Sequence, residues 1–120
     1  MKGIGCDIIE VSRIKHVLEK HGDHFKDRTF TDTEKTYCDS KREPERHYAV
    51  RFAGKEAVAK ALGCGFGEQL SFLDVEISND ASGKPTAVLS EAARKRHNHP
   101  TILISLSHCK EYAQAVAFIS

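Results

Sequence analysis

A run of strong helix formers occupies the middle of the chain: Arg51-Phe52-Ala53-Gly54-Lys55-Glu56-Ala57-Val58-Ala59-Lys60-Ala61-Leu62-Gly63. Alanine, leucine, glutamate, lysine and arginine all favour helices, and Gly63 suits a helix end because glycine tolerates positive φ. Apolar residues lie nearly all the way round this helix, a pattern that is typical of a buried helix. Because Pro44 suits a first helical turn, the sequence predicts a long buried helix that begins there and ends at Leu62.

Glu56 and Lys60 fall along one side of this helix, among small apolar residues. One interpretation is a surface ion pair, which stabilises a helix by only about 0.2–0.5 kcal/mol. The other interpretation is a site, because an unpaired charge among apolar neighbours is costly and small residues leave room for a ligand. In that case Glu56 holds a cation and Lys60 holds an anion.

The overall composition is that of an ordinary globular protein. Hydrophobic residues make up 40% of the 120 residues, and 18 basic and 17 acidic side chains leave a net charge of +1. This balance gives no reason to expect nucleic acid or a membrane as a partner, and no apolar run reaches the length of a membrane span. The four cysteines form no C-x-x-C motif, so they favour neither a zinc site nor a redox pair. We therefore expect one cytoplasmic domain that covers residues 1–120.

The amino-terminal segment, residues 2–11, alternates as a strand does, but it carries Asp7 in its interior. Aspartate is depleted in strands, so Asp7 either lies on a solvated face or serves a site. Gly3 and Gly5 remove side-chain bulk beside it, as strand glycines do where a ligand or another backbone comes close. Together Asp7 and Glu56 make a plausible Mg²⁺ pair, because Mg²⁺ commonly takes one or two carboxylates plus substrate phosphate oxygens.

The rest of the chain predicts an α+β fold, with a mostly antiparallel sheet packed against the long buried helix. Thr31 and Glu34 match a capping box at the start of a short helix, and Ser90 caps another. The remaining predicted elements are a helix over 12–21 closed by Gly22, a connecting segment over 25–30, a hairpin of strands 70–78 and 86–89, and strands over 101–107 and 112–119.

Four pieces of the chain, in this order, closely resemble bacterial holo-acyl-carrier-protein synthases, the small type of 4′-phosphopantetheinyl transferase. They are Gly3-Ile4-Gly5-Cys6-Asp7-Ile8, the run from Arg51 to Gly63, Gly83-Lys84-Pro85, and Ser105-Leu106-Ser107-His108. The departures are Cys6 and Gly54, where such proteins usually carry an aliphatic residue and an alanine. Neither change removes a chemical group that the site would need.

The resemblance implies Mg²⁺-dependent transfer of the 4′-phosphopantetheine arm of coenzyme A to a serine of apo-acyl-carrier protein, in fatty acid biosynthesis. The second product would be adenosine 3′,5′-bisphosphate. The resemblance also implies a homotrimer with active sites between subunits. A rival interpretation is a non-catalytic module that binds coenzyme A without consuming it, for which Asp7 and Glu56 would be unnecessary.

The resemblance also assigns roles by position. It makes Asp7 and Glu56 the Mg²⁺ ligands, Lys60 a phosphate contact, and Arg51 and His108 candidate contacts to coenzyme A phosphates. Gly83, Lys84 and Pro85 would form part of the nucleotide pocket, and Arg13 with its basic helix would bind the acidic carrier protein. The general base stays open between Glu56 and a water near the metal.

Overall fold

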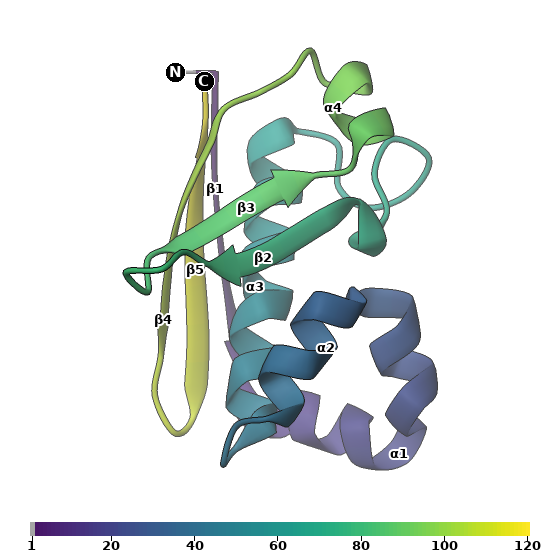
Figure 1. The fold of residues 1–120 in the computed structure, drawn as a ribbon, viewed down its shortest axis with the longest axis vertical. Coiled ribbons are helices and arrows are strands. Elements are labelled where there is room, and N and C mark those ends of the chain that lie inside the picture. The colour runs from purple at the N-terminus through teal and green to yellow at the C-terminus, as the bar shows by residue number, and fades with distance from the viewer. Residues whose placement is uncertain (1) are drawn as a thin grey trace.

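Two antiparallel sheets surround one long helix in the computed structural model, which describes residues 2–120 (Figure 1). The first sheet has the strand order β1-β5-β4, and the second is the hairpin β2-β3. The bounds are β1 (Gly3–Glu10), β2 (Val75–Asn79), β3 (Pro85–Leu89), β4 (Ile102–His108) and β5 (Tyr112–Ile119). The predicted α+β class, with antiparallel strands packed against a buried helix, is confirmed.

The long helix α3 (Pro44–Leu62) has the predicted bounds, with proline in its first turn and Gly63 at φ 77° after its last. Its small residues serve close packing against the first sheet. Gly5 of β1 lies so near the helix that an added Cβ would be 2.6 Å from the Ala61 amide nitrogen. Strand β1 therefore packs closely on this part of α3, as the strand glycines allowed where another backbone comes close.

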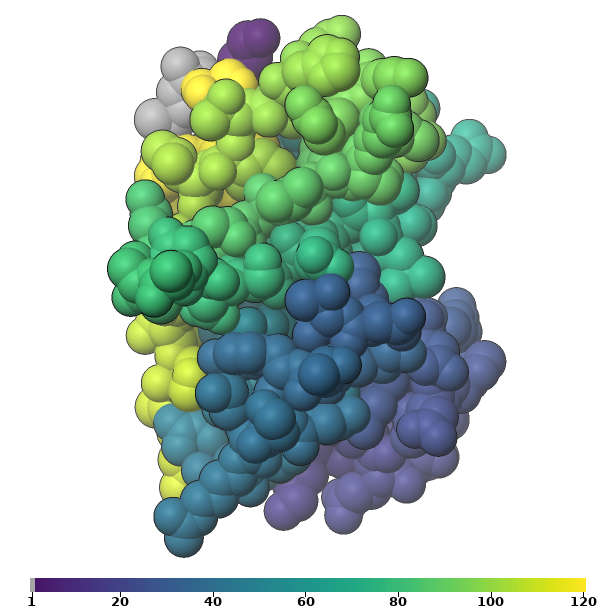
Figure 2. Space-filling model, in the orientation of Figure 1, coloured from purple at the N-terminus to yellow at the C-terminus, as the bar shows by residue number. Residues whose placement is uncertain are grey.

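The amino-terminal helix is longer than predicted. α1 (Val11–Thr29) continues after a break at Gly22, where φ is 47° and ψ is −124°. The segment over 25–30 was predicted as a connection, but it is helical as far as Thr29. The positive φ of Gly22 changes the direction of the helix, and Phe25 then packs beside Phe52. The next helix, α2 (Asp32–Asp39), begins at the predicted capping box of Thr31 and Glu34. In Figure 2, α1 and α2 form the lower part of the visible face, and the hairpin crosses its middle.

The segment before β2 differs from the prediction of a strand from residue 70. A short 3₁₀ helix, η1 (Phe72–Asp74), stands there instead, and β2 begins at Val75. The carboxylate of Asp74 accepts hydrogen bonds from the Ser71 amide and the Ser90 hydroxyl, which hold the turn closed. Ser90 also caps α4 (Glu91–Arg96), as predicted. Over residues 2–120, no helix is both long and apolar enough to cross a membrane.

Candidate functional site

The face of β1 toward α3 brings Asp7 next to Lys60. The Lys60 ammonium donates to Asp7 Oδ1 at 3.1 Å and to the Cys6 carbonyl oxygen at 3.0 Å. The Lys60 side chain stays about half exposed, at 52%, whereas that of Asp7 is 18% exposed. These two residues also line a cavity of about 340 Å³. Two residues that lie far apart in the sequence therefore meet at one accessible point.

Glu56 lies one helical turn before Lys60 and belongs to the same electrostatic group. Burial raises the pKa of the Glu56 carboxyl, the negative charge of Asp7 raises it further, and Lys60 opposes both. The pKa of Lys60 is also raised, chiefly by its hydrogen bond to Asp7. The Lys60 ammonium thus faces two carboxylates, Asp7 through a hydrogen bond and Glu56 through charge alone, which leaves a net negative charge where a cation would be favoured.

The donor set fits a hard divalent cation that keeps most of its shell for water and substrate. Within residues 2–120, no group of three or more histidine, cysteine, aspartate or glutamate side chains is arranged to hold a metal. A site built from Asp7 and Glu56 would therefore supply two carboxylates only. That is the usual protein contribution to Mg²⁺ in phosphate-processing sites.

A second cluster gathers four of the predicted coenzyme A contacts. Arg51, Gly83, Pro85 and His108 line a cavity of about 170 Å³ between α3, the hairpin turn and the end of β4. Lys84 is not among the lining residues, and its amide nitrogen donates to Asp80 Oδ1 at 3.0 Å within the turn. The structure therefore brings together four of these five residues.

The second cluster contains the charged guanidinium group of Arg51 and the imidazole of His108. Arg51 is 2% exposed, and its guanidinium donates to Asn79 Oδ1 at 2.9 Å and lies 4.1 Å from the Tyr37 ring centre. Its Nε is buried without a hydrogen-bond partner among the residues described. Burial lowers the pKa of His108, and the charges of Arg46 and Arg51 lower it further. A buried guanidinium with an unused donor is well suited to an anion.

The two clusters do not meet within one chain. Arg51 and Lys60 are nine residues apart on α3, so their Cα atoms are separated by roughly 13 Å along the helix. No residue that lines the Asp7–Lys60 cavity also lines the Arg51–His108 cavity. A ligand that contacts both clusters must therefore be long, or the clusters must come from neighbouring subunits.

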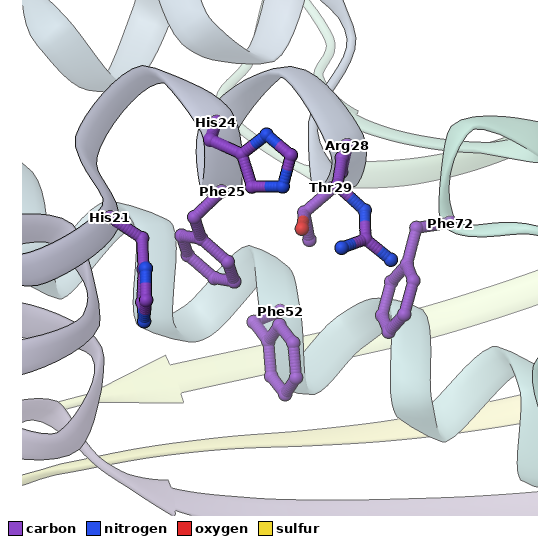
Figure 3. Close-up of a pocket in the computed structure, with 7 residues that line it drawn as sticks. All are labelled: His21, His24, Phe25, Arg28, Thr29, Phe52 and Phe72. Atoms are coloured by element: carbon purple, nitrogen blue, oxygen red, sulfur yellow. The ribbon is translucent and has the colours of Figure 1, made fainter.

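A further large cavity was not predicted from the sequence. It has a volume of about 530 Å³ and lies between α1, α3 and η1 (Figure 3). Its lining residues are His21, His24, Phe25, Arg28, Thr29, Phe52 and Phe72. The spacing of the aromatic residues was the available signal, but it was hidden because residues 25–30 were assigned to a connection. Arg13 is exposed near the other end of α1 and does not line this cavity.

Comparisons with known proteins agree with the geometry. A model of the 4′-phosphopantetheinyl transferase superfamily matches residues 3–117. The chain is 50% identical over 115 residues to a holo-[acyl-carrier-protein] synthase of Protochlamydia amoebophila, covering 96% of this chain and 94% of the relative.

Two solved structures of such synthases superpose on nearly the whole chain. The one from Neisseria meningitidis gives a TM-score of 0.93 at 32% identity and covers 100% of this chain and 98% of its own. The one from Helicobacter pylori, in complex with coenzyme A, gives 0.90 at 34% identity and covers 98% of this chain and 99% of its own. The chain therefore belongs to the 4′-phosphopantetheinyl transferase superfamily.

Proposed function

We propose that this chain transfers the 4′-phosphopantetheine arm of coenzyme A to a serine of apo-acyl-carrier protein, with Mg²⁺ as cofactor, in fatty acid biosynthesis. The observation that carries the proposal is the meeting of Asp7, Glu56 and Lys60 where β1 lies against α3. The relatives named as holo-[acyl-carrier-protein] synthases and the coenzyme A complex from Helicobacter pylori support the choice of both substrates.

The chemistry requires that a serine hydroxyl attack the phosphorus next to the pantetheine, while the bond to the other phosphate breaks. Asp7 and Glu56 would hold Mg²⁺, which would supply charge neutralisation for the pyrophosphate. Lys60 stabilises negative charge on a phosphate oxygen and on the departing adenosine 3′,5′-bisphosphate. Glu56 or a water near the metal would accept the serine proton.

Arg51 and His108 would hold the phosphates of the nucleotide half. The unused donor of Arg51 and the cavity beside Gly83 and Pro85 support this assignment. Gly83 adopts φ 91°, so the turn that forms this wall favours glycine. Lys84 is exposed at the same turn and would act only as a surface charge.

The separation of the two clusters supports active sites between subunits of a homotrimer. The face of the first sheet away from α3 is apolar and open, with Ile4 60%, Ile8 65% and Leu103 59% exposed. The antiparallel register places Phe118 opposite both Ile4 and Leu103, so these residues form one apolar row. A row of this kind on a monomer marks a protein interface.

The oligomeric state has its own test. Ile8→Glu should give a monomer in sedimentation velocity, whereas the wild type should sediment as a trimer. A wild-type chain that stays monomeric at micromolar concentration would refute the assembly.

The acidic carrier protein would dock along α1. Arg13, Lys15 and Lys20 are exposed on this helix, and Arg28 lines the large cavity at its carboxyl end. Opposite charges of this kind act mainly by speeding association and by making it sensitive to salt. The large cavity of Figure 3 would receive an apolar side chain of the carrier protein.

The decisive experiment mixes the protein with coenzyme A, Mg²⁺ and an apo carrier protein and follows the mass of the carrier. We expect the mass of one phosphopantetheine arm to be added, and Asp7→Asn or Glu56→Gln to abolish the addition. Glu91→Gln, an exposed change on α4, is the matched control and should leave the rate unaltered. An unmodified carrier would favour the non-catalytic binding module, and full activity of both site variants would refute the metal assignment.

A further inference from the structure

A buried ion pair that the proposed chemistry does not use lies behind the large cavity. The Lys55 ammonium is 2.7 Å from Glu34 Oε1, and both side chains are 0% exposed. Lys55 is adjacent in sequence to Glu56, but the rotation of about 100° per residue along a helix turns it toward α1 and α2 instead of β1.

Every polar atom of this pair is engaged. Lys55 donates to the Thr29 carbonyl oxygen at 2.8 Å and to the Phe72 carbonyl oxygen at 2.9 Å, in addition to Glu34. Glu34 Oε1 accepts from the Thr31 amide at 2.8 Å, and Oε2 accepts from the Ile77 amide at 2.7 Å. The pair therefore joins the end of α1, the start of α2, η1 and β2 at one point on α3.

Two of these partners are walls of the large cavity. Thr29 and Phe72 both line it, on α1 and on η1 respectively (Figure 3). The Phe72 ring is stacked between two others, 5.5 Å from the Phe52 centre and 3.8 Å from the Phe66 centre. Lys55 thus fixes the separation of the two cavity walls through their main chains.

Stability alone is a weak reason for such a pair. Buried ion pairs can often be replaced by apolar side chains without loss of stability, because desolvation offsets most of the attraction. What an apolar replacement cannot do is bind two particular carbonyl groups on two different elements. The cavity walls would then be free to shift against each other.

We propose that Lys55 and Glu34 are positioning residues for carrier-protein docking, which they serve by setting the width of the cavity between Phe25, Phe52 and Phe72. This inference rests on the proposed function, and it concerns the carrier protein and not coenzyme A. Neither residue lines the Arg51–His108 cavity or the Asp7–Lys60 cavity.

The test uses the double variant Lys55→Met/Glu34→Gln, which removes both charges together and so leaves no unpaired buried ion. We expect the KM for carrier protein to rise about tenfold, as when an aromatic-lined pocket loses its fit, while the KM for coenzyme A changes less than twofold. Ile119→Ala is the control for lost stability, because it truncates a buried residue of β5 that lines none of the three cavities. It should leave both KM values unchanged.

A second measurement does not depend on activity. In protein labelled with 4-fluorophenylalanine, the fluorine signals of Phe25, Phe52 and Phe72 should shift or broaden in the double variant, and that of Phe118 should not. A folded double variant with unaltered signals and an unaltered KM for carrier protein would overturn the proposal.

Phe72→Leu keeps the main-chain bond to Lys55 while changing the wall itself, so it tests the cavity even if the double variant fails to fold. It should also raise the KM for carrier protein, and an unchanged value would overturn the proposal. If the proposed function itself were wrong, the wild-type protein would add no phosphopantetheine arm to the carrier protein. This result differs from an active wild type whose variants show an unchanged KM.

Discussion

Replacing Gly5 by alanine should damage both stability and activity, through one steric cause. The new Cβ would lie 2.6 Å from the Ala61 amide nitrogen and 2.9 Å from Lys60 Cβ. Ordinary contacts begin near 3.4 Å, so β1 must move away from α3 by at least 0.8 Å, the difference between 3.4 and 2.6 Å. Overpacking of this kind typically costs about 1–3 kcal/mol. For a chain of this size, we expect the melting temperature to fall by roughly 4–12 °C.

The same displacement should carry Asp7 away from Glu56 and Lys60, because Asp7 lies two residues along the same strand. A shift of about 1 Å in a reacting group can cost on the order of 10²-fold in rate. Calorimetry and a carrier-mass assay measure the two effects. Gly67→Ala is the matched control, since a Cβ at Gly67 meets nothing within 4 Å. If Gly5→Ala melted and reacted like Gly67→Ala, the close packing of β1 on α3 would be refuted as the basis of the site.

Three further predictions concern charge. The pKa of Glu56 is raised in the folded state, so its protonated carboxyl contributes to stability below the ordinary pKa of 4.5, and this contribution is lost as the pH rises through the pKa of the folded state. Glu56→Gln should therefore raise the melting temperature at pH 7.5. The difference in melting temperature between the variant and the wild type should vanish below pH 4.5. Arg13→Glu should raise the KM for carrier protein far more than the KM for coenzyme A. The control variant Lys95→Glu on α4 should change neither KM. Equal effects of Arg13→Glu on the two KM values would show that Arg13 is not part of the docking surface. His47 lines the same cavity as His108, with the two ring centres 5.2 Å apart. Burial lowers the pKa of both side chains, so affinity for adenosine 3′,5′-bisphosphate, measured calorimetrically, should increase below pH 6.5. A variant with glutamine at both positions should lack this increase.

Local patterns were sufficient for most of the secondary structure. The capping box at Thr31, the proline at the start of α3 and the glycine after it each mark a boundary by a mechanism that acts within four residues. The errors occurred where tertiary contacts override local preference. Gly22 breaks α1 without ending it, because the aromatic contact of Phe25 with Phe52 makes a second helical segment favourable.

The candidate site was predictable only in its parts. Asp7, Glu56 and Lys60 stood out because charged residues are unusual on a glycine-rich strand and on a buried helix. The large cavity was not predicted, since three distant segments form it and residues 25–30, which carry one of its aromatic side chains, were assigned to a connection. Gly3 and Gly5 indicated a close approach by a ligand or by another backbone, but the pattern could not distinguish the two, because a substrate and a neighbouring strand require the same lack of bulk.

The charged side chains of α3 fall into two groups with different surroundings. Lys55 and Glu56 are neighbours, yet Lys55 is completely buried with three partners, whereas Glu56 is only partly buried beside a second carboxylate. A fully satisfied pair has no reason to bind a ligand, and it can only hold its surroundings in place. A carboxylate with a like charge nearby is stabilised by any cation that arrives, so the incomplete cluster around Lys60 is the one suited to chemistry. Rotation along the helix would therefore separate the proposed positioning pair from the proposed catalytic cluster, with adjacent residues on different faces.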